Sequence, residues 1–156
     1  MGSADGQFEL PLEIGDGGWT LAFAGVNPQA ERVRETLCAL GNGRFLTRAA
    51  APEAGAATGL DETHYPGTYA AGIYNRLISF LHGHPHEDES LVNLPNWLPL
   101  GWRTDGCGWV VPNGVGFQEY EQRLDLRTGV LHRRYRYTDE AGRSTTVESS
   151  ALVSMP

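Results

Sequence analysis

The sequence predicts an all-β protein, built as an antiparallel β-sandwich with one or two short helices. In the carboxyl third, segments 120–126, 130–138 and 143–153 alternate apolar with polar residues and are separated by turn sequences, as in a three-stranded meander. Elsewhere, 20 glycines and 9 prolines divide the chain into short segments, which argues against long helices. A sheet with one buried and one solvated face needs a second layer, so these observations favour a sandwich.

The meander also predicts which side chains face the core. Along each strand, apolar residues recur at every second position, and charged or polar residues stand between them. The residues expected on the buried face are Tyr120, Leu124, Leu126, Leu131, Tyr135, Tyr137, Val147, Ala151 and Val153.

The amino-terminal part predicts one strand followed by one helix. Residues 19–26 form an apolar run of strand length, and Asn27 and Pro28 are suited to the cap and first position of a helix. Val33, Leu37 and Leu40 then recur at near-helical spacing. We therefore expect a short helix between Pro28 and Leu40.

The middle of the chain predicts turns and short strands. Gly41 is expected as a left-handed C-cap of the helix, followed by a turn, a strand at 44–47 and an exposed loop of small residues at 49–59. Residues 69–77 are rich in strand formers. Two prolines exclude 91–100 from the centre of a sheet, so this segment is expected at an edge with Trp97 packed inward.

Length, charge and cysteine content narrow the class of protein. A chain of 156 residues suits one domain, for which we expect a tag remnant and lead-in at 1–18 and the folded domain at 19–156. The net charge of -7 excludes nucleic acid as an expected partner, and no apolar run is long enough for a membrane helix. Cys38 and Cys107 form no C-x-x-C pair, which favours reduced thiols and a cytoplasmic location. Phosphate-binding glycine patterns are missing, so no cofactor is expected.

Four sequence motifs carry a family resemblance. They are ETLCALGNGRFLTR at 35–48, YPGTYAAGIYN at 65–75, LVNLPNW at 91–97 and LDLRTGVLHR at 124–133. The first resembles the E-x-L-x-x-L-G-N-G-x-x-x-x-R opening of the N-terminal domain of family 65 glycoside hydrolases and phosphorylases, and all four follow the family order. The chain departs from this family at Ser149 and Ser150, one of which stands near an arginine of the family's R-x-x-S-M strand.

The resemblance implies a β-supersandwich that precedes a linker and an (α/α)6 barrel. In this family the barrel carries the catalytic acid and the phosphate or water site, and it is expected to lie outside this chain. The family's chemistry is inverting cleavage of α-glucosidic bonds in trehalose, maltose or kojibiose. We therefore expect a domain without catalytic residues that supports the barrel of the same polypeptide, with contributions to α-glucoside binding or to a homodimer.

Aromatic and amide side chains are the candidate binding residues. Trp97 and Tyr74 could stack on sugar rings, and Asn75, Asn93 and Asn96 could form hydrogen bonds with hydroxyl groups. The competing interpretation is that the aromatic rings fill the sandwich core or the contact with the barrel.

Two alternatives belong to other functional classes. One is a free-standing, lectin-like carbohydrate-binding module that uses the same aromatic residues. The other is a cupin-type metal enzyme, in which His82 and His84 share a metal ion and Glu89 completes the ligand shell. The flanking glycines and the second histidine motif of a cupin are missing, so no metal is expected. Candidate carboxylates for catalysis are Asp61, Glu62, Glu87, Asp88, Glu89, Glu119 and Glu121.

Overall fold

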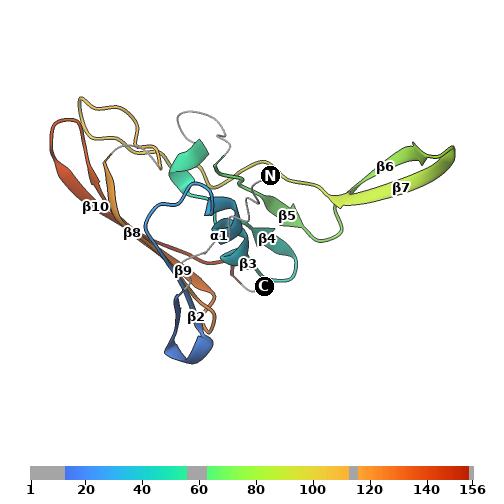
Figure 1. The fold of residues 1–156 in the computed structure, drawn as a ribbon, viewed down its shortest axis with the longest axis horizontal. Helices are drawn as coiled ribbons and strands as arrows, with labels where there is room; N and C mark the ends of the chain where they lie inside the picture. The colour runs from blue at the N-terminus through green and yellow to red at the C-terminus, as the bar shows by residue number, and fades with distance from the viewer. Residues whose placement is uncertain (1–12, 56–62, 113–115, 155–156) are drawn as a thin grey trace, which may run out of the picture.

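The computed structural model describes residues 13–55, 63–112 and 116–154, and within these residues the strands form three antiparallel sheets (Figure 1). The largest contains, in spatial order, β1 (Glu13–Gly15), β2 (Thr20–Ala24), β8 (Phe117–Asp125), β9 (Val130–Thr138) and β10 (Ser144–Ala151). The second contains β3 (Leu40–Gly41), β4 (Phe45–Thr47) and β5 (Thr68–Ala70), and the third is a ribbon of β6 (Tyr74–Leu81) and β7 (His84–Leu91). The helical elements are η1 (Asp16–Gly18), α1 (Glu31–Leu37) and η2 (Pro52–Gly55). The predicted all-β class is confirmed.

The core lies between the five-stranded sheet and a layer that contains α1 and β3. Phe23, Leu124 and Leu131 project from β2, β8 and β9, and they pack against Cys38 and Leu40. Burial of such side chains contributes roughly 1.5–3 kcal/mol each. The expected two-layer arrangement is therefore present around a small apolar cluster.

The meander forms where the alternation predicted it, with β8, β9 and β10 paired in succession. Tyr120, Leu124, Leu131 and Tyr135 are buried as expected. Two other residues of the predicted face are exposed, Leu126 because it lies beyond the end of β8 and Ala151 because it lies at the end of the edge strand β10. A β-bulge interrupts the pairing of β8 with β9 between Gln118 and Glu121. Glu119, at this bulge, has a left-handed backbone with φ of 51°.

Helix α1 differs from its prediction in both its start and its buried face. It begins at Glu31 with Ala30 as the N-cap residue, because Asn27 and Pro28 belong to a preceding turn. Val33 and Leu37 are both 44% exposed, whereas Arg34 is fully buried. Two residues of the predicted apolar stripe, Val33 and Leu37, therefore face outward, since the inner face of the helix is occupied by charged side chains that have partners in the surrounding layer. The third, Leu40, is buried as expected but lies in β3.

Gly41 lies in β3 and is not the predicted left-handed C-cap. A Cβ atom at this position would lie 3.0 Å from the carbonyl oxygen of Phe45, so glycine permits the close approach of β3 and β4. The positive φ of 83° occurs at Gly43. The side chain of Asn42 closes this turn by accepting hydrogen bonds from the amides of Arg44 and Phe45.

The loop of small residues is buried over the part that the structure describes, contrary to the prediction. Ala50, Ala51 and Ala54 are at most 9% exposed, and Glu53 is 5% exposed. The loop is covered because Glu53 reaches into the interior to contact β9. Residues 56–59 of the predicted loop lie outside the described residues.

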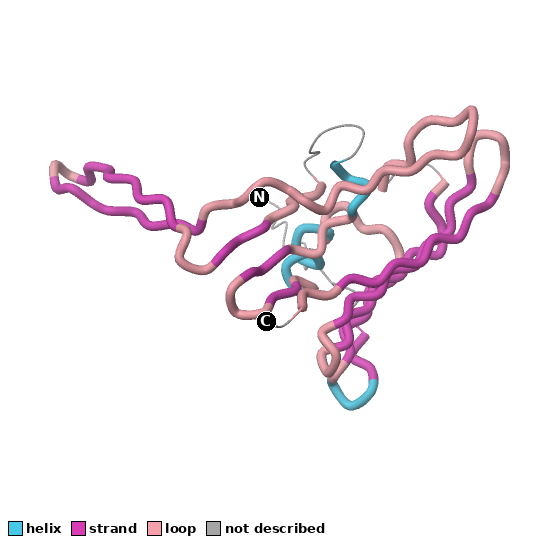
Figure 2. The backbone as a smooth tube through the Cα atoms, turned by 180° about the vertical axis from the view of Figure 1, so that it is seen from behind, coloured by secondary structure: helices cyan, strands magenta, loops and turns pink. Residues whose placement is uncertain are grey.

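The segment predicted as one strand at 69–77 is divided by a turn at Gly72, where φ is 85°. Its second half enters the β6–β7 ribbon, which extends away from the body of the molecule (Figures 1 and 2). Residues 92–100 form no strand, and Trp97 is 57% exposed instead of packed inward. The turn at Gly72 and the irregular segment 92–100 set the root of the ribbon. Among the described residues, every helix is too short or too polar to cross a bilayer.

Candidate functional site

Glu35 is the centre of a buried polar cluster between α1 and residues 64–68. Its Oε1 atom lies 2.8 Å from Nδ1 of His64, and its Oε2 atom accepts a hydrogen bond of 3.0 Å from the backbone amide of Tyr65. Glu35 and His64 are 1% and 3% exposed. A buried carboxylate is stable only when charged or hydrogen-bonding partners surround it, so these contacts fix the position of the 64–68 segment on the helix.

Arg48 joins the same cluster from the end of β4. Its Nη2 atom lies 3.5 Å from Oε2 of Glu35 and donates a hydrogen bond of 2.6 Å to the carbonyl oxygen of Arg32. Its Nε atom donates to the carbonyl oxygen of Tyr65, over whose ring the guanidinium lies at 5.2 Å. Glu35 and Arg48 are the first and last residues of the 35–48 motif, which therefore encodes two ends of one structural contact.

Arg34 anchors α1 to the end of β2. Its Nη1 atom donates to the carbonyl oxygen of Gly25 at 2.7 Å and to Oε1 of Glu31 at 3.3 Å. The guanidinium also lies 5.4 Å from the centre of the Phe23 ring. Burial raises the pKa of the Glu31 carboxyl, and the positive charge of Arg34 opposes this shift only in part.

A second buried cluster connects η2 to the five-stranded sheet. The hydroxyl of Tyr135 donates to Oε1 of Glu53 at 2.7 Å and accepts a hydrogen bond of 2.8 Å from Nε1 of Trp102. Arg133 forms an ion pair with the other carboxylate oxygen of Glu53. Burial, reinforced by the Glu53 contact, raises the pKa of the Tyr135 hydroxyl. Phe117 stacks on Tyr135 with ring centres 4.3 Å apart.

These two clusters are suited to holding segments together. The carboxylates of Glu31, Glu35 and Glu53 are at most 5% exposed, and each contacts an arginine, histidine or tyrosine side chain. A general acid that cleaves a glycosidic bond must reach the oxygen of a bound sugar. Buried and paired carboxylates of this kind instead position the chain around them.

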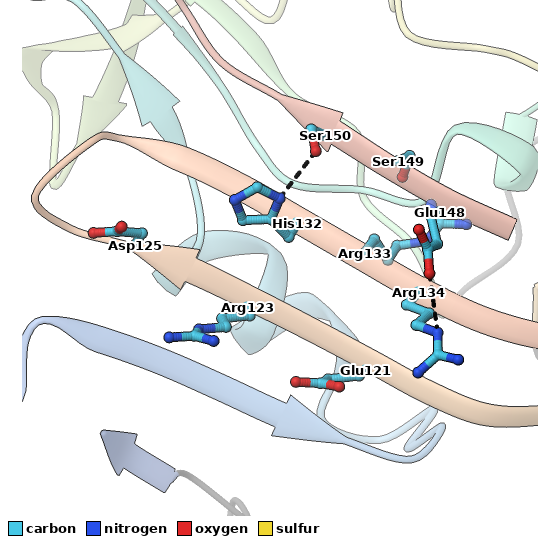
Figure 3. Close-up of a pocket in the computed structure, with 9 residues that line it drawn as sticks. All are labelled: Glu121, Arg123, Asp125, His132, Arg133, Arg134, Glu148, Ser149 and Ser150. Atoms are coloured by element: carbon cyan, nitrogen blue, oxygen red, sulfur yellow. Dashed lines mark hydrogen bonds and ion pairs between the residues drawn. The ribbon is translucent and has the colours of Figure 1, made fainter. Parts of the chain in front are cut away.

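A polar groove of about 500 Å³ lies on the outer face of β8, β9 and β10 (Figure 3). Across the strands, Nε of Arg134 lies 3.2 Å from Oε1 of Glu148, and Nδ1 of His132 lies 2.9 Å from Oγ of Ser150. Its lining residues are Glu121, Arg123, Asp125, His132, Arg133, Arg134, Glu148, Ser149 and Ser150. The guanidinium of Arg133 is buried against Glu53. The other charged lining residues are Arg123, Arg134, Glu121, Asp125 and Glu148, so the groove offers donors and acceptors with a slight excess of negative charge.

A hollow of about 270 Å³ lies where the ribbon meets the three-stranded sheet. Its lining is mainly apolar and includes Phe45, Leu46 and Tyr69 from the sheet. Tyr74 and Leu91, which pair at the root of the ribbon, also line it. Tyr74, one of the predicted binding residues, therefore lies in this apolar hollow.

Trp97 and Asn96 lie in the irregular segment that follows the ribbon. The ring of Trp97 lies against Phe45, with ring centres 5.9 Å apart and planes inclined by 56°. Oδ1 of Asn96 accepts a hydrogen bond of 3.1 Å from the amide of Leu98, which forms a local turn. Trp97 and Tyr74 therefore both lie near Phe45: Trp97 contacts its ring, and Tyr74 lines the same hollow.

Asn93 and Asn75 have different surroundings. Asn93 accepts a hydrogen bond from the amide of Thr68 at 3.0 Å and donates one to the carbonyl oxygen of Pro66 at 3.3 Å, so its amide fixes residues 66–68. Asn75 lies on the ribbon opposite Ser90, on the face that Tyr74 does not occupy.

The proposed cupin shell of His82, His84 and Glu89 does not form. His82 lies in the turn at the ribbon tip with φ of 51°, and His84 begins β7. Glu89 stands five residues along the same strand, which places it on the opposite face and roughly 16 Å away at about 3.3 Å per residue. In the part of the chain that the structure describes, no three metal-binding side chains are grouped. A metal ion shared by His82 and His84 requires both residues on one face of a strand, and His82 lies in the turn before β7.

The other candidate carboxylates are exposed or lie outside the described residues. Oε1 of Glu119 lies 2.6 Å from Nη2 of Arg136, and Glu121 lines the polar groove. Arg76 is paired with both Glu87 and Glu89. Asp61 and Glu62 lie outside the described residues.

The buried residues that complete the two clusters, Glu53 and His64, were not among the predicted site residues. Glu53 is the one acidic residue in a run of alanine, proline and glycine. Such a pattern predicts a solvent-exposed charge in a loop. His64 precedes the 65–75 motif by one position. For the first cluster, the available signal was the pair of opposite charges at the two ends of the 35–48 motif, because a buried charge needs a partner. The sequence carries no comparable signal for Glu53.

Comparison with known proteins identifies relatives over most of the chain. An uncharacterized glycosyl hydrolase of Mycobacterium tuberculosis is 46% identical over 140 residues, which are 90% of this chain and 10% of that protein. Kojibiose phosphorylase of Caldanaerobacter subterraneus is 30% identical over 141 residues, 90% of this chain and 16% of that enzyme. Trehalose 6-phosphate phosphorylase of Lactococcus lactis is 40% identical over 117 residues, 73% of this chain and 14% of that enzyme. The chain thus spans a small part of the length of these relatives.

The solved structure of a candidate kojibiose phosphorylase from the human microbiome shares the fold. It superimposes with a TM-score of 0.72 at 23% identity, over 89% of this chain and 18% of that one. The family model described as glycosyl hydrolase family 65, N-terminal domain, matches residues 21–156. The chain therefore belongs to glycosyl hydrolase family 65, as an example of its N-terminal domain.

Proposed function

We propose that this chain is a non-catalytic domain that supports the (α/α)6 barrel of an inverting phosphorylase or hydrolase acting on α-glucosides. The family match and the names of two relatives, kojibiose phosphorylase and trehalose 6-phosphate phosphorylase, support cleavage of an α-glucosidic bond, with phosphate as the favoured nucleophile. The chain spans 10% to 16% of its relatives, which supports a role as one part of a larger enzyme.

The use of the family motifs for internal contacts is the observation that carries this proposal. Glu35 and Arg48, at the ends of the first motif, hold residues 64–68 on α1. Arg133, at the end of the last motif, holds Glu53 on β9. Ionisable groups used in this way make a rigid scaffold, and their buried positions keep them away from a substrate.

Inverting cleavage needs two groups on opposite sides of the sugar. The nucleophile attacks the anomeric carbon from one side of the sugar, while an acid protonates the departing oxygen on the other side. Cleavage of an α-glucoside by phosphate with inversion gives β-glucose 1-phosphate. We assign the acid and the phosphate site to the barrel.

Turnover assays test the proposal directly. The 156-residue chain, incubated with trehalose, maltose or kojibiose with and without phosphate, should release neither glucose nor glucose 1-phosphate. A longer polypeptide containing this domain and the barrel should release β-glucose 1-phosphate from one of these sugars when phosphate is present. Release by the short chain that disappears in the Glu121→Gln or Glu89→Gln variant would contradict the proposal.

Carbohydrate binding is a second candidate function, favoured by the exposed Trp97 and Tyr74 around Phe45. A sugar stacked on Trp97 should change the indole fluorescence in a saturable way during a maltose titration, and Trp97→Ala should abolish the change. Trp109→Ala is the matched control, because Trp109 is similarly exposed but lies under Arg103. An unchanged spectrum at high maltose concentration would exclude this role for the hollow.

A further inference from the structure

Among the residues that the structure describes, none forms a layer over the β6–β7 ribbon, which extends from the body (Figures 1 and 2). Leu77, Ile78, Phe80 and Leu81 are between 63% and 73% exposed, and every residue of β7 is exposed. An isolated two-stranded ribbon is marginally stable in water, and natural sheets usually cover apolar side chains of this size. The ribbon therefore has the properties of an element that completes its packing against another surface.

The strand register divides the ribbon into two faces. Directly opposed residues of an antiparallel pair share a face. One face contains the pairs Tyr74 with Leu91, Arg76 with Glu89, Ile78 with Glu87, and Phe80 with Pro85. The other contains Asn75 with Ser90, Leu77 with Asp88, Ser79 with His86, and Leu81 with His84.

The first face is the more apolar of the two, and its charged side chains, Arg76, Glu87 and Glu89, are paired with one another. Nε of Arg76 lies 2.9 Å from Oε2 of Glu89 and 3.5 Å from Oε1 of Glu87. On the second face, Asp88 accepts a hydrogen bond from Ser79 and pairs with His86, each at 3.2 Å, which makes a polar network. We call the apolar residues of the first face, Tyr74, Ile78, Phe80, Pro85 and Leu91, the ribbon strip.

The ribbon strip continues into the hollow at its root. Tyr74 and Leu91 belong to both, and Phe45 and Leu46 extend the apolar lining into the three-stranded sheet. Trp97, which lies against Phe45, adds a further exposed ring beside it. Apolar side chains therefore occur along this face from the ribbon tip to the body of the domain, and the pair of Arg76 with Glu89 interrupts them near the root.

We propose that the ribbon strip and the hollow form the surface on which the catalytic barrel of the same polypeptide docks, an inference that rests on the proposed function. The relatives carry several times more polypeptide than the matched part, and a covalent connection gives that remainder a high effective concentration. A second copy of this chain is the weaker candidate, because each copy has a net charge of -7 and the two would repel. On the face of the ribbon strip, Glu87 and Glu89 exceed Arg76 by one negative charge, which favours a partner surface bordered by basic residues.

Hydrogen exchange in the full-length polypeptide tests this docking. In the isolated chain, the amides of residues 74–91 should exchange quickly, since the ribbon has no covering layer. In the full-length polypeptide, their exchange should be slower by roughly a factor of ten or more. The double variant Ile78→Ser with Phe80→Ser should remove this protection, because both changes alter the ribbon strip.

Leu77→Ser with Leu81→Ser is the matched control, since it removes two equally exposed apolar side chains from the opposite face. This variant should keep the protection. Both double variants of the isolated chain should retain the wild-type melting temperature, which separates lost docking from failed folding.

Two results would overturn the inference. One is equal ribbon exchange in the isolated chain and in the full-length polypeptide. The other is a dimer of the isolated chain, measured by sedimentation, that dissociates in the Ile78→Ser, Phe80→Ser variant, because the ribbon strip would then belong to a second copy. The turnover of the wild-type full-length polypeptide is measured separately, so failure of the proposed function is distinguishable from failure of the docking surface.

Discussion

The Nδ1 atom of His64 lies 2.8 Å from Oε1 of Glu35, although 29 positions separate the two buried residues in the chain. Glu35→Ala should lower the free energy of unfolding by about 3–5 kcal/mol, because it leaves His64, Arg48 and the amide of Tyr65 without their shared acceptor. Urea denaturation of both proteins measures this difference.

Glu148→Ala provides the control for Glu35. Glu148 is paired with Arg134 across two strands, but both side chains are more than half exposed. Exposed pairs contribute about 0–1 kcal/mol, so this variant should remain close to the wild type. Equal destabilisation by Glu35→Ala and Glu148→Ala would show that the Glu35 cluster does not hold residues 64–68 on α1.

Tyr135→Phe should lower the free energy of unfolding by about 1–3 kcal/mol. The change removes the hydroxyl that donates to Glu53 and accepts from Trp102, and it leaves both partners buried or partly buried. Tyr137→Phe, on the same strand, keeps the ring contacts with Trp102 and Phe117 and serves as the comparison. A Tyr135→Phe protein as stable as the Tyr137→Phe protein would contradict the role given to this hydroxyl.

The stability of the β9–β10 turn should depend on pH through the carboxyl group of Asp139. Burial raises its pKa, but hydrogen bonds from Arg143 and Thr104 outweigh that effect and lower the pKa from 3.8 to about 2. Because the folded pKa lies below the unfolded value, the stabilisation is complete above about pH 4 and is lost as the pH falls towards 2.

The unfolding free energies of wild type and Asp139→Asn, compared from about pH 7 to about pH 2, should therefore converge at the acid end. Glu140→Gln removes the same charge from the neighbouring exposed position and is the control. A difference between wild type and Asp139→Asn that does not change with pH would argue against an ionised Asp139 in the turn.

The two cysteines should differ in reactivity. Burial raises the pKa of the Cys38 thiol to about 12, and the side chain is fully buried. Cys107 is partly exposed, with Nη2 of Arg143 3.4 Å from its Sγ atom. A thiol reagent at mildly alkaline pH should modify one cysteine in the native chain and two after denaturation. The Cys107→Ser variant should react only when unfolded, and rapid modification of this native variant would show that Cys38 is accessible.

The carboxyl meander was predictable because its signal is local. Alternate side chains of a strand point to opposite faces, so the spacing of Leu124, Leu131 and Tyr135 indicated a strand and its buried face together. The turn at Asp139 also follows from nearby residues, since its side chain caps the amides of Ala141 and Arg143.

The orientation of α1 was not predictable from periodicity. Hydrophobic spacing selected Val33 and Leu37, but the helix turns these residues outward. Its inner face is determined by distant partners, the carbonyl oxygen of Gly25 for Arg34 and the segment at His64 for Glu35. Hydrophobic periodicity takes account only of apolar side chains, so it cannot predict contacts that charged side chains make with distant segments.

The candidate binding residues show the same limit. Tyr74 and Trp97 come together around Phe45 because the ribbon returns the chain to the three-stranded sheet. The motifs identified the segments that carry these residues. The spatial arrangement depends on the turn at Gly72, which the run of strand formers concealed.

The buried charged side chains of α1 allow the helix only one position and orientation in the fold. Apolar contacts have no direction, so a leucine-faced helix can slide or rotate slightly and still cover its core. Here Arg34 must meet one carbonyl group and Glu35 must meet one imidazole and one amide, and a shift of one residue misplaces all of them. The helix therefore cannot be replaced by another helix that lacks these charged side chains. In chimaeras between family members, a protein that receives α1 alone should fail to fold, whereas a protein that receives α1 together with Gly25, β4 and residues 64–68 should contain all of these partners.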